Sequence, residues 1–104
     1  MGIRMSSSMH AAITDFAALE DRSISTIGRL AIRELLEQGN FAEVALDDAE
    51  PLIATAQFRI PRSLHAEFEH QAKAAQIESL SALLRAALRE FLHQRGVAPE
   101  GRAA

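Results

Sequence analysis

Three polar side chains alternate with apolar ones in the segment Thr55-Ala-Gln-Phe-Arg-Ile60. A period of two residues is typical of a strand with one face in solvent, so Thr55, Gln57 and Arg59 should share that face. Such side chains suit the recognition of DNA base edges. Arginine matches the two acceptors of guanine, glutamine matches an adenine edge, and threonine matches a polar edge or the thymine methyl group. This segment is therefore the first candidate for a binding surface.

Catalytic and metal-binding patterns are weak in this chain. His65 and His70 flank two glutamates, but the histidines are five residues apart and point away from each other on a helix. The two-histidine zinc motif instead uses positions i and i+4. Cysteine is absent, which excludes a disulfide scaffold, a cysteine zinc site and a cysteine nucleophile. With no paired catalytic residues and no glycine-rich phosphate loop, we predict no enzymatic activity, no metal and no cofactor.

The elements that must position the polar segment belong to an internal repeat. Residues 24–38 (ISTIGRLAIRELLEQ) return as residues 80–94 (LSALLRAALREFLHQ), with seven identities in fifteen positions. Apolar residues recur in both copies at i, i+3 and i+7, which predicts two amphipathic helices. Gly28 stands where the second copy has Leu84, and it either weakens its helix slightly or lets another backbone approach closely. Residues suited to cap or stop these helices lie at their ends: Ser23, Ser25, Ser79, Ser81, Gly39 and Gly96.

A weaker match, at an offset of 55, precedes each long helix. It aligns residues 9–13 with residues 64–68, which predicts a shorter helix in each copy, the first beginning at the serines 6–8. It also aligns residues 3–5 with residues 58–60, which predicts a second short strand near Met1. Each copy then reads strand, helix, turn, helix. A unit of about 40 residues is near the size below which a lone domain rarely holds together, so the two copies should share one core.

The predicted organisation is a first copy (1–39), an acidic linker (40–54), a second copy (55–96) and a disordered tail (97–104). The linker contains four acids and no base: Glu43, Asp47, Asp48 and Glu50. Fifteen extended residues reach roughly 50 Å, so the linker can join the copies in almost any arrangement. The net charge of −3 argues against non-specific nucleic-acid binding but leaves room for a local basic surface.

An alternating strand that ends in Arg-Ile-Pro, then a helix, a turn, a serine and a helix of the form Leu-x-x-Ala-Leu-Arg-Glu-Phe-Leu, resembles the ribbon-helix-helix family of Arc/MetJ-type DNA-binding proteins. Residues 55–95 carry most of the resemblance, and residues 2–38 follow through the repeat. In this family two copies interlock and their strands form an antiparallel ribbon that lies in the DNA major groove. The resemblance to tandem members implies a mainly α fold with a short two-stranded antiparallel β ribbon and pseudo-two-fold symmetry.

The resemblance also implies the DNA contacts. The outer face of the ribbon would contact bases through residues of both strands: Gly2, Arg4, Thr55, Gln57 and Arg59. Free N–H groups at the starts of the two long helices would hold phosphates, as the second helix does in such folds: Ser23, Ile24, Ser25, Ser79, Leu80 and Ser81. Because Gly2 stands where the other copy has Gln57, the two halves of the ribbon would read different bases, and the target should be an imperfect palindrome.

The turns between helices depart from the family pattern. Family members commonly have a glycine there, whereas this chain has Glu20-Asp21-Arg22 and Gln76-Ile77-Glu78. Acids so close to the helix starts would weaken phosphate contacts. The repeated arginines of the long helices (Arg29, Arg85, Arg33 and Arg89) we interpret as a solvated surface, or as ion pairs with Glu34 and Glu90, rather than as binding residues.

We expect a sequence-specific double-stranded DNA-binding protein, acting as a transcriptional repressor or as an accessory factor at a plasmid or phage locus. The copies would form an intramolecular pseudo-dimer, with homo-oligomers on DNA as a further option; the sequence leaves open whether they pair within or between chains. No apolar run approaches the roughly 18 residues of a membrane span, and no signal-peptide pattern opens the chain. We therefore expect no membrane contact and a cytoplasmic location.

Two alternatives stay open. An antitoxin or assembly adaptor would bind a protein partner through the linker segment 41–54, using its apolar side chains: Phe41, Val44, Leu46, Leu52 and Ile53. A toxin gene beside this one would favour that interpretation. The other alternative is a small helical bundle with no nucleic-acid role.

Overall fold

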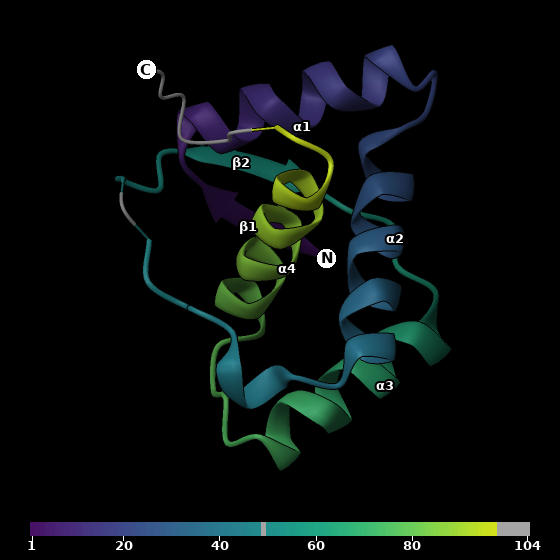
Figure 1. The fold of residues 1–104 in the computed structure, drawn as a ribbon, viewed down its shortest axis with the longest axis vertical. Coiled ribbons are helices and arrows are strands. Elements are labelled where there is room, and N and C mark those ends of the chain that lie inside the picture. Colours follow the sequence, from purple (N-terminus) through teal and green to yellow (C-terminus); the bar gives the residue numbers. More distant parts are fainter. Residues whose placement is uncertain (49, 98–104) are drawn as a thin grey trace.

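The computed structural model describes residues 1–48 and 50–97. The elements follow one another in this order: β1 (Gly2–Met5), α1 (Ser7–Leu19), α2 (Ile24–Gln38), the 3-10 turn η1 (Phe41–Glu43), β2 (Ala54–Gln57), α3 (Arg62–Ala74) and α4 (Leu80–Gln94) (Figure 1). The predicted order of strand, helix, turn and helix therefore occurs twice. The expectation of a mainly helical fold with one two-stranded antiparallel sheet is confirmed.

The two strands pair antiparallel within one chain, so the two copies share a single ribbon. Gly2 lies opposite Gln57, and Arg4 lies opposite Thr55. The ladder continues one step past the strands, because the Phe58 N–H donates to the Met1 carbonyl at 2.8 Å and the Met1 amino group donates to the Phe58 carbonyl at 2.8 Å. The pairing left open by the sequence is thus intramolecular.

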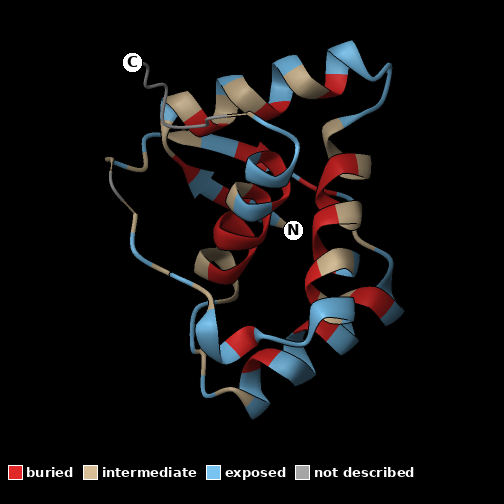
Figure 2. Ribbon diagram, in the orientation of Figure 1, coloured by how far each residue is buried: buried red, intermediate tan, exposed pale blue. Residues whose placement is uncertain are grey.

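The core lies between the ribbon and the four helices. α2 and α4, the repeated helices, pack against each other, while β1 contacts α4 and β2 contacts α1. Figure 2 shows that the outer faces of α1 and α3 are largely exposed and that the buried residues face inward. The largest fully buried side chains come from both copies: Met5, Ile13, Ile27, Ile32, Phe58, Phe68, Leu83, Leu84, Leu88 and Leu92.

Serine side chains cap α1, α2 and α4 as predicted, whereas α3 starts after Pro61 without a side-chain cap. The Ser23 hydroxyl accepts from the Thr26 N–H at 3.2 Å, and the Ser79 hydroxyl accepts from the Ala82 N–H at 3.1 Å. Ser6 does the same at the start of α1. α2 ends at Gly39, whose φ of 68° is the left-handed conformation that glycine adopts without steric cost.

The helix–helix turns use left-handed residues other than glycine. Asp21 has a φ of 56° and Gln76 a φ of 62°. These residues are 55 positions apart and so occupy equivalent places in the two copies. The turn therefore keeps the conformation that glycine favours, although the sequence supplies aspartate and glutamine there.

Gly28 makes room for an aromatic ring. A Cβ atom added to Gly28 would lie 2.5 Å from Cδ2 of Phe58, which is too close for two carbon atoms. The sequence offered a weakened helix or a close backbone at this position. The structure shows that a side chain, and not a backbone, makes the close approach.

The acidic linker follows a path that is fixed at several points. Phe41 is buried, and its ring centroid lies 6.5 Å from that of Phe68. Asp48 forms an ion pair with Arg85 at 3.0 Å, and Glu50 accepts a hydrogen bond from the Ser8 hydroxyl at 2.6 Å. The linker therefore follows the surface of the protein and does not span the roughly 50 Å that an extended segment of its length could reach.

One residue that follows α4, Val97, packs against the core. Val97 is partly buried against the core, and its N–H donates to the Leu92 carbonyl at 2.9 Å. The rest of the predicted disordered tail, residues 98–104, lies outside the described residues. Within the described ranges, no helix has the length and apolar character needed to cross a membrane.

Candidate nucleic-acid interface

The outer face of the ribbon carries the side chains that the sequence placed there. Exposed and buried residues alternate along both strands, and the ones on the inner face, Ile3 and Ala56 among them, belong to the core. The outward positions are those of Gly2, which has no side chain, and of Arg4, Thr55 and Gln57. The structure thus brings together four of the five predicted base-contacting residues on one surface.

Arg59, the fifth predicted residue, lies just beyond β2. The strand ends at Gln57, and the Arg59 side chain is exposed. Its backbone is held on both sides by α2, since its N–H donates to the Ser25 hydroxyl at 2.8 Å and its carbonyl accepts from Arg29 Nη1 at 2.8 Å. The Arg59 side chain therefore extends from a fixed backbone, although no ladder partner faces it.

Two helix arginines hold the two ribbon arginines in a reciprocal arrangement. Arg29 of the first copy donates to the carbonyl of Arg59 in the second copy, and Arg85 of the second copy donates to the carbonyl of Arg4 in the first, at 2.9 Å. The repeat aligns Arg29 with Arg85 and Arg4 with Arg59. Each copy thus supplies an arginine that fixes the ribbon residue of the other.

For Arg29, Arg85 and Arg89, these contacts correct the interpretation of the helix arginines as a solvated surface or as partners of Glu34 and Glu90. Arg33 is exposed, as that interpretation expects. Arg85 is only 8% exposed and its acid partner is Asp48. Glu34 instead pairs with Arg95, whose guanidinium lies 3.6 Å from the Phe91 ring centroid. The repeat marked both arginines as identical between copies, and that identity was the signal available in the sequence.

The predicted phosphate-contacting residues differ in what they do. Ser23 and Ser79 use their hydroxyls as helix caps. Ser25 accepts from the Arg59 N–H, so it joins the start of α2 to the ribbon. Ile24 and Leu80 are partly buried against the core and can offer a ligand only their backbone.

Two hollows lie beside the ribbon and meet at Gln57. One, of about 550 Å³, we name the Arg29 hollow; it is lined by Met1, Arg29, Gln57, Phe58, Arg59, Ile60 and Pro61. The other, of about 470 Å³, we name the Arg85 hollow; it is lined by Gly2, Ile3, Arg4, Leu52, Thr55, Gln57, Ser81 and Arg85. Each hollow contains one ribbon arginine and the helix arginine that fixes it.

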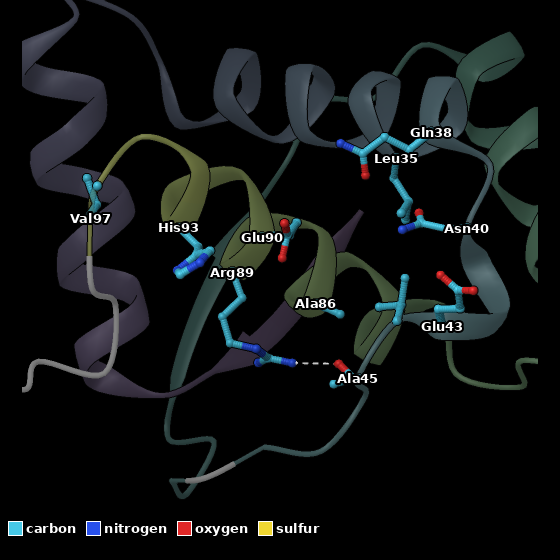
Figure 3. A pocket seen from close by; sticks show the side chains of 12 residues that line it. Leu35, Gln38, Asn40, Glu43, Ala45, Ala86, Arg89, Glu90, His93 and Val97 are labelled. Atoms are coloured by element: carbon cyan, nitrogen blue, oxygen red, sulfur yellow. Dashed lines mark hydrogen bonds between the residues drawn. The ribbon is translucent and has the colours of Figure 1, made fainter.

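A larger pocket of about 760 Å³ lies away from the ribbon, between α2, α4 and the segment after η1 (Figure 3). Leu35 and Ala86 form part of its wall, and Glu43, Glu90 and Arg89 add charges of both signs. Arg89 Nη2 donates to the Ala45 carbonyl at 3.0 Å across this pocket. None of the residues predicted to contact DNA lines it.

The linker offers a protein partner little apolar surface. Phe41 is 6% exposed and forms part of the core, and Val44 and Leu46 are partly buried against it. Of the five apolar side chains assigned to the antitoxin or adaptor alternative, Ile53 is the large one that stays exposed, at 70%. Most of these apolar side chains in the segment 41–54 therefore pack within the protein itself.

A comparison with protein-family models, with curated proteins and with solved structures found no match. The resemblance to ribbon-helix-helix proteins thus stays a prediction from the sequence.

Proposed function

We propose that this protein binds double-stranded DNA in a sequence-specific manner by placing its ribbon in the major groove, and that it acts as a transcriptional repressor or as an accessory factor at a plasmid or phage locus. The observation that carries the proposal is the outer ribbon face, where Arg4, Thr55 and Gln57 extend into solvent with Arg59 beside them. The fold would then be a tandem ribbon-helix-helix in one chain.

The dimensions of the ribbon support this proposal. Paired strands lie about 5 Å apart, and the major groove of B-form DNA is about 12 Å wide, so two strands with their side chains fit the groove. β1 and β2 have four residues each and carry no further strand in the described part of the chain. A short, isolated ribbon of this kind can enter a groove that a larger sheet cannot.

The chemistry of the ribbon face also suits base recognition. Arginine supplies a fork of N–H donors, glutamine both donates and accepts, and threonine adds a methyl group to its hydroxyl. A Cβ atom added to Gly2 would lie 2.6 Å from Nε2 of Gln57, so the Gln57 amide reaches across the ribbon to its partner strand. One amide therefore serves the Gly2–Gln57 pair, where a symmetric ribbon would have two.

The register of the ribbon agrees with a pseudo-two-fold arrangement. A two-fold axis through a ribbon places a residue opposite its own equivalent, and Gly2 and Gln57, which the offset of 55 aligns, are paired. The reciprocal contacts of Arg29 and Arg85 follow the same relation. An interface built this way would meet two related half-sites, with a difference at the centre where glycine faces glutamine.

The interface is also held in place before any ligand arrives. The backbones of Arg4 and Arg59 are both hydrogen-bonded to helix arginines, so the cost of ordering these backbones, though not their exposed side chains, is met during folding. Pre-organised contact residues lose less conformational entropy on binding.

Selection from random double-stranded DNA at moderate salt tests the proposal. We expect one motif to be enriched and to survive a rise in salt concentration, because specific contacts depend less on salt than charge attraction does. Arg59→Ala should abolish specific binding and Arg4→Ala should weaken it, each with unchanged helical content by circular dichroism. The matched control is Arg33→Ala, which removes the same charge from an exposed position on α2.

The proposal fails if no motif is enriched, or if both ribbon variants bind the enriched site as tightly as the unmodified protein. A loss of binding in Arg33→Ala as large as that in Arg59→Ala would show that total charge, and not the ribbon face, sets the affinity.

A further inference from the structure

We infer that the two hollows beside the ribbon are unequal phosphate sites: the Arg29 hollow is the main site, and Asp48 weakens the Arg85 hollow. This inference rests on the proposed function and names the feature that makes the two sides of its interface differ in phosphate affinity.

The Arg29 hollow keeps its positive charge. Arg29 donates to the Arg59 carbonyl and, at 3.0 Å, to the Thr26 hydroxyl, and both acceptors are neutral. None of the ion pairs in the described part of the chain involves Arg29 or Arg59. A guanidinium carries five N–H donors, so these two bonds leave donors for a phosphate oxygen. Two guanidinium groups without an acidic partner among the described residues therefore share this hollow.

In the Arg85 hollow, Asp48 partly compensates one of the two arginine charges. Arg85 Nε donates to Asp48 Oδ1 at 3.0 Å, and the Arg85 and Asp48 side chains are only 10% and 21% exposed. Arg89 approaches the same carboxylate oxygen at 3.5 Å. Because the pair is mostly buried, salt screens it little, and the carboxylate also repels a phosphate that approaches the hollow. Arg4 is the arginine of this hollow that takes part in none of the ion pairs of the described residues.

The origin of the difference is the linker. The repeat supplies an arginine to each hollow, but the chain passes from the first copy to the second only once, and it passes beside Arg85 with Asp48. The Arg29 hollow has no linker segment among its lining residues, whereas the Arg85 hollow includes Leu52. A protein made of two chains with this fold would have no such difference between its halves.

The test compares Asp48→Asn with Asp47→Asn, using the full chain and the DNA site enriched from the random pool. Asparagine keeps an oxygen that can accept from Arg85 Nε but removes the charge. Asp47 is adjacent and exposed, so the control removes the same charge from the same segment. We expect Asp48→Asn to bind about three- to tenfold more tightly and to steepen the dependence of log K on log salt by about 0.9, the value for one added phosphate contact. Asp47→Asn should change neither by a comparable amount.

A second readout locates the phosphates directly. Ethylation of single phosphates should interfere strongly with binding on the side of the site that faces Arg29, and weakly on the other side. In Asp48→Asn the two sides should become similar. Arg29→Gln should weaken binding about tenfold and reduce the salt slope by about 0.9, with Arg33→Gln as the control.

A purely structural role for Asp48 predicts the opposite sign, since a damaged fold binds DNA more weakly. Equal binding by Asp48→Asn and Asp47→Asn, or equal interference on both sides with the unmodified protein, would overturn the inference while the proposed function stands. Failure to enrich any motif would overturn both.

Discussion

The two copies fill equivalent places in the core with opposite distributions of volume. The second copy contributes Phe58 from the ribbon, and its ring occupies the space above Gly28 of the first copy. At the corresponding positions the first copy contributes Ile3 and the second contributes Leu84, both buried. A large ribbon residue thus packs on a small helix residue at Gly28, and the residues that the repeat aligns with this pair, Ile3 and Leu84, have the opposite size relation.

The sizes of these residues limit which copies can pair. Two first copies would combine Ile3 with Gly28 and leave a void, whereas two second copies would combine Phe58 with Leu84 and exceed the space available. Cores tolerate neither well, because both a cavity and an excess of volume cost stability. The departures from repeat symmetry therefore favour the pairing of unlike copies, as in the ribbon of β1 and β2.

Replacing Gly28 by the leucine found at position 84 should have the largest effect on stability. Gly28→Leu would drive a side chain into the Phe58 ring and should lower the free energy of unfolding by about 2–3 kcal/mol, even though leucine favours a helix more than glycine does. Adding Phe58→Ile to this variant should restore most of the loss, since the pair then matches Ile3 and Leu84. Urea denaturation of the two single variants and the double variant measures the coupling. Additive losses would show that Gly28 and Phe58 do not share one space.

The two helix arginines offer a second comparison, with a smaller expected effect. Arg85→Gln should cost about 1–2 kcal/mol, because it leaves the half-buried Asp48 carboxylate and the Arg4 carbonyl with fewer donors. Arg29→Gln should cost less than about 1 kcal/mol, because its acceptors lie nearer to solvent and water can replace the guanidinium. Denaturation midpoints of the two variants measure this difference. An equal loss of stability in both would contradict the view that the contact with Asp48 distinguishes Arg85 from Arg29.

The turns between helices should show the smallest effect, and one of opposite sign. Gln76→Gly should stabilise the protein by about 0.5–1 kcal/mol, because it removes the strain of a left-handed glutamine. Asp21→Gly should gain less, since aspartate tolerates this conformation better. Ala75→Gly is the control, because Ala75 has a φ of −92° and glycine offers no relief there. A gain in Ala75→Gly equal to that in Gln76→Gly would point to a cause other than φ.

The regular elements could be predicted from the sequence because their signals are local. The repeated segments 24–38 and 80–94 coincide with α2 and α4, since apolar periodicity, a serine before the helix and, for α2, a glycine after it all agree. The second strand was predicted to reach Ile60, but β2 ends at Gln57. Arg59 makes its backbone hydrogen bonds with Ser25 and Arg29 of α2, and alternation alone does not reveal that competition.

The contacts that distinguish the two sides of the ribbon could not be predicted. Arg29 and Arg85 donate to backbone carbonyls, and every residue has a carbonyl, so no residue type marks the acceptor. The Asp48–Arg85 pair joins residues 37 positions apart through a linker that has no periodicity. The choice between Asp47 and Asp48 depends on the path of the chain, which only the packed structure provides.

Because both strands of the ribbon belong to one polypeptide, dilution of the protein does not separate them. A ribbon shared by two chains comes apart as the protein concentration falls below the dissociation constant of the dimer, whereas a ribbon closed within one chain has a concentration-independent folding equilibrium. Each strand is also encoded once, so a single codon change alters Arg4 without altering Arg59. A symmetric dimer must change both halves together; this chain can adjust one side of its surface and keep the other.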